Sequence, residues 1–197
     1  HFLSKNKLPF FFDKSHVLGT LNIENSDSIA TFIISETLVH QIKKRSGGSR
    51  EICSPSLKLK VANKWILDNI LDKIPVSKQA NGFVKNRSIV TNATMHIHTT
   101  ESWLLRIDID NFFFNISLNS IIKMFQNIGY VNEVANVLAS ICSYEGHLPQ
   151  GFPTSPYLAN LFLKEFDHQV FEFCEKLDSE VIYTRYADDL IISGLKK

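Results

Sequence analysis

The sequence predicts an α+β fold in which helices pack on one face of a small antiparallel sheet. First, apolar and polar residues alternate from Trp103 to Asp110, which is typical of a strand. Second, two apolar runs, Val181 to Tyr183 and Leu190 to Ile192, flank a tight turn near the end of the chain. Third, the residues between these strands have helical periodicity. A small antiparallel sheet with helices in this order forms stacked layers.

The composition fits a globular chain with a substantial core. The 197 residues correspond to one domain or two small subdomains. The formal net charge is +1, so any nucleic-acid surface must come from local clusters of Lys and Arg. Three widely spaced cysteines predict reduced thiols in a reducing compartment. No apolar run is long enough to predict a membrane span. Because the chain starts at His1 and stops just after a strand, we expect a fragment of a longer protein.

The N-terminal part is expected to contain a short helix and a hairpin. Residues 26–35 predict the helix, with Ser26 or Asp27 as its cap. Thr37 to Ile42 predicts a strand that returns through a Gly-Gly turn as a second strand at Glu51 to Cys53.

This hairpin carries four cationic side chains within eight residues, namely Lys43, Lys44, Arg45 and Arg50. One interpretation is a basic tip that binds phosphate, in which Arg50 makes bidentate contacts and Lys44 a point-charge contact. The alternative is a solvated turn, the more common role of a charge run.

Two long helices are predicted. The first begins at Ser54-Pro55 and ends before Pro75, with Ser54 as its N-cap. Its expected buried stripe is Leu57, Val61, Trp65, Leu67, Ile70, Leu71 and Ile74. The second begins at Ser155-Pro156. Its expected buried stripe is Leu158, Phe162, Phe166, Val170, Phe173 and Leu177.

Three shorter helices are predicted in the middle of the chain. Ser88 caps a helix from Ile89 to about His98, which places Asn92 and His96 on one helix face. A histidine at such a place is more often a structural residue than a ligand. Two further helices follow the strand at 103–110, and their expected limits are Ser117 to Gly129 and Val131 to Cys142.

Carboxylates stand at the ends of the predicted strands. Asp108 lies on a strand expected to be buried, where a carboxylate is costly unless it is paired or metal-bound. Asp188 and Asp189 are adjacent at a turn, where they must be solvated, paired or metal-bound. Since Asp is also a common turn residue, this pair alone has a simpler explanation. Neighbouring strands that bring Asp108 beside the turn would create an all-oxygen site that suits Mg²⁺. Two such ions support phosphoryl transfer.

Four motifs in this order resemble the fingers and palm of reverse transcriptases, across residues 40–193. A fingers segment of bacterial members is similar to Arg50-Glu51-Ile52 with Pro55 and Leu57, and the first catalytic palm motif is similar to Asp108 to Phe113. The motif that supports template and nucleotide is similar to Gln150 to Pro156 with Asn160. The metal-binding hairpin is similar to Tyr186-Ala187-Asp188-Asp189.

The resemblance implies that Asp108 and Asp188 bind two Mg²⁺ ions, for which Mn²⁺ can substitute, and that Asp189 assists or is structural. Asp110 departs from the basic or variable residue of the family, and we interpret it as an exposed carboxylate rather than a ligand. Phe113 falls at the family's steric gate against a 2′-hydroxyl. The alternative is a core aromatic, with Phe112 or Phe114 in the gate position.

The resemblance implies roles for further residues. Those expected to bind the dNTP or border the primer end are Lys44, Arg50, Gln150, Gly151 and Tyr186. Those expected to contact RNA, with a structural role as the alternative, are Arg87, Asn92 and His96. The implied subdomains are an N-terminal segment at 1–36, fingers at 37–102 and a truncated palm at 103–197 without its thumb.

Within the family, Asn92-Ala93-Thr94-Met95-His96 is similar to the Asn-Ala-x-x-His element of retron enzymes, although group II intron and antiphage-defence lineages share parts of the pattern. The resemblance implies an RNA-directed DNA polymerase of the bacterial cytoplasm that acts in antiphage defence. Its implied partners are an RNA template and primer, dNTPs, a structured noncoding RNA and an associated effector protein, with no membrane. The alternative is a catalytically weak RNA-binding platform. The intact carboxylates Asp108, Asp188 and Asp189 favour the polymerase.

Overall fold

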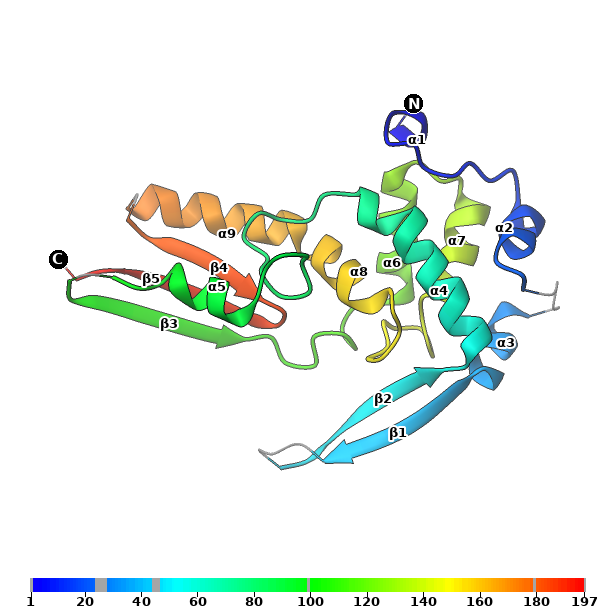
Figure 1. Ribbon diagram of the computed structural model, residues 1–197, viewed down its shortest axis with the longest axis horizontal. Coiled ribbons are helices and arrows are strands. Elements are labelled where there is room, and N and C mark those ends of the chain that lie inside the picture. Colours follow the sequence, from blue (N-terminus) through cyan, green and yellow to red (C-terminus); the bar gives the residue numbers. More distant parts are fainter. Residues whose placement is uncertain (1, 24–27, 44–46, 99, 179, 197) are drawn as a thin grey trace. The chain divides into compact units, whose positions relative to one another are not determined.

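The computed structural model describes residues 2–23, 28–43, 47–98, 100–178 and 180–196. They form two compact units (Figure 1). Unit 1 contains His1–Ile74 and Phe113–Ala159, and unit 2 contains Pro75–Phe112 and Asn160–Lys197. Each unit is therefore assembled from two separate stretches of the chain. The expected subdomain limits at residues 36 and 102 do not coincide with these units and stay a prediction.

Unit 1 is mainly helical and carries one antiparallel hairpin. Its elements are α1 (Phe2–Lys5), α2 (Lys14–Thr20), α3 (Ile29–Ser35), β1 (Thr37–Lys43), β2 (Ser49–Pro55), α4 (Leu57–Asn69), the 3₁₀ helix η1 (Leu71–Lys73), α6 (Leu118–Ile128) and α7 (Asn132–Ile141). Helix α7 is central, because α2, α3, α4 and α6 all pack against it. Helix α8 (Ser155–Phe162) starts in unit 1 and ends in unit 2.

The hairpin and the caps of unit 1 follow the sequence closely, with two corrections. Ser117 caps α6, and Gly129 ends it in the left-handed conformation with φ of 113°, as expected. Helix α3 is capped by Ser28, and the expected caps at 26 and 27 lie outside the described residues. Helix α4 is capped by Ser56 and not by Ser54, because β2 continues to Pro55 by pairing with β1.

The expected buried stripe was wrong at the start of α4, whereas Ile70, Leu71 and Ile74 at the end of the stripe are buried as expected. Leu57 is 79% exposed and Val61 58% exposed, and the buried residues of the helix are instead Leu59, Ala62, Asn63 and Ile66. Asn63 explains the error, because a polar residue occupies a core position. Its amide donates to the carbonyls of Leu59 at 3.1 Å and Ile141 at 3.0 Å, and its Oδ1 accepts from Thr154 Oγ1 at 2.6 Å.

Unit 2 is a three-stranded antiparallel sheet with helices, which confirms the α+β prediction. Its elements are α5 (Ile89–Thr94), β3 (Ser102–Asp108), α9 (Lys164–Leu177), β4 (Ile182–Tyr186) and β5 (Asp189–Leu195). The sheet order is β3-β5-β4, so β5 is central and β3 and β4 are edges (Figure 1). Ser88 caps α5 as expected, but the helix ends at Thr94 and not near His98.

Different parts of the chain pack on the two faces of this sheet. Helix α9 packs on one face, where Cys174, Tyr183 and Leu190 form a buried cluster. On the other face, His96 contacts the hydroxyls of Thr184 and Ser193. These side chains alternate with those under α9, as the period of two in a strand requires.

Two expectations about burial in unit 2 were wrong. The second long helix is interrupted at Leu163, so α8 and α9 are separate, and Phe166 and Phe173 on α9 are exposed. The buried row of α9 passes through Asp167 and Cys174. A polar residue therefore occupies a core position here, as Asn63 does in α4. Strand β3 was expected to be largely buried, but it is an edge strand with all seven residues exposed.

Two expectations from composition also have a structural outcome. Cys53, Cys142 and Cys174 are free and buried, as expected for reduced thiols. Among the helices that the structure describes, none is both long enough and apolar enough to cross a membrane.

Replacing Asn63 by Leu is expected to lower the free energy of unfolding by about 1–3 kcal/mol. The substitution leaves the Ile141 carbonyl and the Thr154 hydroxyl buried without their amide partner. Urea unfolding measures the change. Asn127→Ala, at an exposed position of α6, is the control and should shift the value by less than about 0.5 kcal/mol. Equal stability of the two variants would contradict the assigned role of Asn63.

Candidate active site at the β4–β5 turn

Three carboxylates gather at one end of the sheet in unit 2. Strand β3 pairs with β5 so that Asp108 lies opposite Asp189. The Ile109 amide donates to the Asp188 carbonyl at 3.0 Å, which ties the end of β3 to the turn between β4 and β5. Residues that are 80 positions apart in the sequence are therefore neighbours, as the sequence predicted.

Asp108 and Asp189 project from the face of the sheet opposite α9. Leu105 and Ile107 on β3 pair with Ile192 and Leu190 on β5, and these two β5 residues belong to the cluster under α9. Since side chains alternate along a strand, Asp108 and Asp189 point the other way. Tyr186 pairs with Asp189 and shares that face.

Arg106 is the cation of this group. Its Nε and Nη2 donate to the two carboxylate oxygens of Asp189 at 2.8 and 3.0 Å. This bond is the largest cause that raises the pKa of the Arg106 guanidinium, and the charges of Asp189, Asp108 and Asp188 raise it further. All three carboxylates therefore act on one guanidinium. The alternation along the strand, which places Arg106 on the same side as Asp108, is the sequence signal for this contact.

The carboxylate oxygens of this group are of the chemical type that binds a magnesium ion. Carboxylate oxygens are the ligands that Mg²⁺ prefers, and the site already holds a cationic group against these carboxylates. Both carboxylate oxygens of Asp189 are bonded to Arg106. Within the described part of the chain, no three His, Cys, Asp or Glu side chains are arranged to hold a metal ion.

The residues expected to contact the nucleotide lie mostly in unit 1. Arg50 is an exposed residue of β2, whereas Lys44 lies outside the described residues. The Gln150 carbonyl accepts from the Cys53 amide at 2.7 Å, which binds the loop at 150–156 to β2. Gly151 has a φ of 118°, and a Cβ there would collide with the Cys53 carbonyl, so this contact requires glycine.

The three consecutive phenylalanines have different environments. Phe112 is buried and belongs to the core, whereas Phe114 is exposed and lies against the His147 ring at 4.3 Å between centroids. Phe113 is half-buried, between these extremes. Burial places Phe112 in the core, and the steric gate at Phe113 stays a prediction.

The residues expected to contact RNA make internal contacts. Arg87 donates to the carbonyls of Lys78 and Ala80, and the Asn92 side chain is buried. His96 uses both ring nitrogens, with Nδ1 2.7 Å from Ser193 Oγ and Nε2 2.6 Å from Thr184 Oγ1. The bonds of Arg87 and His96 favour the structural alternative for these two residues, whereas Asn92 Oδ1 is buried without a hydrogen-bond partner among the residues that the structure describes. RNA contact by the three residues stays a prediction.

Residues 42–196 match the sequence family described as reverse transcriptase (RNA-dependent DNA polymerase). The chain belongs to the reverse transcriptase family. Its four motifs lie in the matched region, and members of the family use divalent metal ions. The expected family and the expected fold class are thereby confirmed.

Curated relatives of this reverse transcriptase chain include retron enzymes, which confirms the expected retron-type resemblance. It is 42% identical to the retron Ec86 reverse transcriptase of Escherichia coli over 74% of the chain and 44% of that protein. It is 35% identical to the retron Ec73 reverse transcriptase of Escherichia coli over 77% of the chain and 51% of that protein. The chain thus spans about half the length of these relatives.

Solved structures share the fold of this reverse transcriptase chain. An apo telomerase from Candida tropicalis, truncated from its C-terminal domain, aligns with a TM-score of 0.54 and 14% identity, over 82% of this chain and 44% of that one. A telomerase from Candida albicans, in complex with a fragment of telomeric RNA, aligns with a TM-score of 0.52 and 13% identity, over 81% and 38% of the two chains. At this identity the likeness concerns the fold alone.

Lowering the pH below 6.5 is expected to destabilise the protein through His96. Burial, and then the charge of His98, lower the pKa of His96 below its ordinary value of 6.5. The unfolded chain therefore binds the proton more readily, so the stabilising effect is complete above pH 6.5 and is lost as the pH falls below it. His96→Gln should lose less stability than the wild type between pH 7.5 and 5.5 in thermal unfolding. His168→Gln, at an exposed position of α9, is the control. Equal pH dependence of all three proteins would refute the expectation.

Proposed function

We propose that the whole protein is an RNA-directed DNA polymerase, which adds dNTPs to a primer 3′-end on an RNA template. The observation that carries this proposal is the group of Asp108, Asp188 and Asp189 at one sheet end, in a chain of the reverse transcriptase family. Such carboxylates suit phosphoryl transfer, which depends mainly on positioning and charge neutralisation.

Each carboxylate has a distinct role in the proposed site. Asp108 and Asp188 would hold two Mg²⁺ ions, and the bidentate bond from Arg106 holds the Asp189 carboxylate. When bound, the ions activate the attacking hydroxyl and neutralise the leaving phosphate. Tyr186 shares the face of Asp189 and borders the primer end.

The remaining roles in the proposal follow the family motifs. Lys44 and Arg50 bind the triphosphate, and Arg50 suits this role because its guanidinium makes bidentate bonds to phosphate. Gln150 and Gly151 line the nucleotide pocket, where a glycine permits close approach of the backbone.

The proposal extends to the retron type, in which the enzyme makes RNA-linked DNA in antiphage defence. Support comes from the curated relatives in Escherichia coli, which are named retron reverse transcriptases. The proposed partners are a structured noncoding RNA and an effector protein, and the proposed location is the bacterial cytoplasm.

Asp188→Asn is expected to lower primer extension by the full-length protein by at least about 100-fold, the effect of removing one group that stabilises transition-state charge. Incorporation of dNTPs on an RNA template is measured with and without Mg²⁺. Asp110→Asn is the matched control, since it removes a nearby exposed carboxylate that is not assigned as a ligand. It should retain most of the activity.

Two outcomes would overturn the polymerase proposal. One is the absence of Mg²⁺-dependent incorporation by the wild type together with retained RNA binding, which would support the catalytically weak platform. The other is equal incorporation by the wild type and Asp188→Asn.

Phe113→Ala is expected to reduce the preference for dNTPs over ribonucleotides by about 10- to 200-fold, because a smaller side chain admits the 2′-hydroxyl. The ratio of the two kcat/KM values measures this preference. Phe114→Ala removes an exposed neighbouring ring and should leave the ratio unchanged. A preference that moves with Phe114 and not with Phe113 would reassign the gate.

A further inference from the structure

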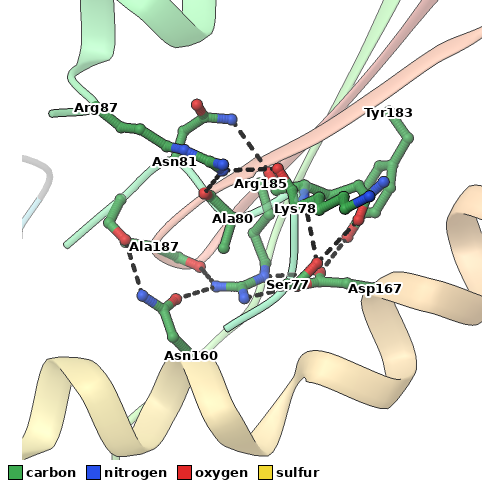
Figure 2. A network of polar contacts seen from close by, with 12 residues as sticks. Ser77, Lys78, Ala80, Asn81, Arg87, Asn160, Asp167, Tyr183, Arg185 and Ala187 are labelled. Carbon is green, nitrogen blue, oxygen red and sulfur yellow. Dashed lines mark hydrogen bonds and ion pairs between the residues drawn. The ribbon is translucent and has the colours of Figure 1, made fainter. Parts of the chain in front are cut away.

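Arg185 is a fully buried guanidinium that lies next to the turn and bonds three different groups (Figure 2). Its Nε and Nη2 each donate to one carboxylate oxygen of Asp167, both at 2.8 Å. Its Nη1 donates to Asn160 Oδ1 and to the Ala187 carbonyl, both at 2.9 Å. One side chain thus connects α8, α9 and the residue that precedes Asp188.

The partners of Arg185 are also buried and bonded. Asp167 is fully buried and accepts a third bond from the Tyr183 hydroxyl at 2.7 Å. Asn160 donates from Nδ2 to the Gly82 carbonyl at 2.9 Å. A buried ion pair is tolerated only when such additional bonds satisfy its remaining polar atoms, and this one meets that condition.

The backbone of Arg185 is fixed as well. Its amide donates to the Gln79 carbonyl at 2.8 Å, and its carbonyl accepts from the Asn81 amide at 2.7 Å. These bonds attach the segment before Gly82 to the edge of β4. A Cβ at Gly82 would collide with the Ala187 amide, so this segment also lies directly against the turn.

The turn itself needs support. Ala187 has a φ of 58°, in the left-handed region that a residue with a Cβ rarely adopts. Such a conformation persists only where the surroundings determine it. The bond from Arg185 to the Ala187 carbonyl supplies that constraint from the face that α9 covers, and the close approach of Gly82 supplies it from the edge of β4.

We propose that the Asp167–Arg185 pair is a positioning element of the active site, which fixes the Ala187 carbonyl and thereby the direction of the Asp188 carboxylate. Neither residue touches a substrate. The pair acts from the face of the sheet opposite Asp108 and Asp189, through the backbone of the turn. This inference rests on the proposed polymerase function.

The test compares two variants of the full-length protein with the wild type. Arg185→Lys keeps a positive charge for Asp167 but lacks the fork that reaches Asn160 and Ala187. Arg185→Met combined with Asp167→Leu removes both charges together, a replacement that is often neutral for stability. Three quantities are measured: the thermal midpoint, the kcat and KM for a dNTP, and the affinity for Mn²⁺ without substrate by electron paramagnetic resonance.

Both variants are expected to lower kcat by at least about tenfold, within the loss that a small misplacement of a catalytic group causes. The KM for the dNTP should change by less than about twofold, and Mn²⁺ should bind several-fold more weakly, because only the direction of Asp188 has changed. Tyr183→Phe is the matched control. It removes one bond to the same Asp167 without touching the turn, so kcat and the Mn²⁺ affinity should be retained.

Wild-type kcat and Mn²⁺ affinity in a folded double variant would overturn the inference, and so would equal losses in Tyr183→Phe. If the double variant does not fold, Arg185→Lys decides by the same measurements. Asp188→Asn separates the two proposals. Full activity of that variant refutes the polymerase site, whereas an inactive Asp188→Asn beside fully active Arg185 variants refutes only the positioning role.

Discussion

The buried ion pair of Asp167 and Arg185 constrains most of unit 2. Removing two charges from water costs roughly several kcal/mol per ion. Well-aligned hydrogen bonds between the two side chains and to their neighbours must offset that cost. The carboxylate accepts three bonds, and the guanidinium also reaches Asn160 and the Ala187 carbonyl. Helix α9, strand β4 and the turn therefore share one set of bonds, and none of them can shift without breaking part of it.

The two faces of the sheet consequently have different roles. The face under α9 is packed with apolar side chains and the ion pair, and it determines where the turn lies. The opposite face presents Asp108 and Asp189 with Arg106, where Arg106 is largely exposed. Because side chains alternate along each strand, the same sheet carries the supporting groups on one face and the carboxylates on the other.

The sequence predicted the fold class, the hairpin at 188–189 and the proximity of Asp108 correctly, because strand alternation and turn chemistry are local signals. It failed where a polar residue occupies a core position. Asn63 on α4 and Asp167 on α9 lie in buried rows, so stripes drawn through apolar residues alone included exposed positions such as Leu57 and Phe173. A carboxylate in register with Leu163 and Cys174 was the available signal for the ion pair. The exposure of β3 depends on sheet order, which no local pattern encodes.

The same contacts distinguish the two adjacent carboxylates of the turn. Asp189 begins β5, and its side chain is held by a bidentate bond from Arg106. Asp188 is held through its backbone: its carbonyl accepts from Ile109, and the residue before it is fixed by Arg185. A carboxylate whose two oxygens both pair with a guanidinium has less capacity to bind a metal ion. The bond from Arg106 therefore supports the proposal that Asp189 assists and is not the main metal ligand.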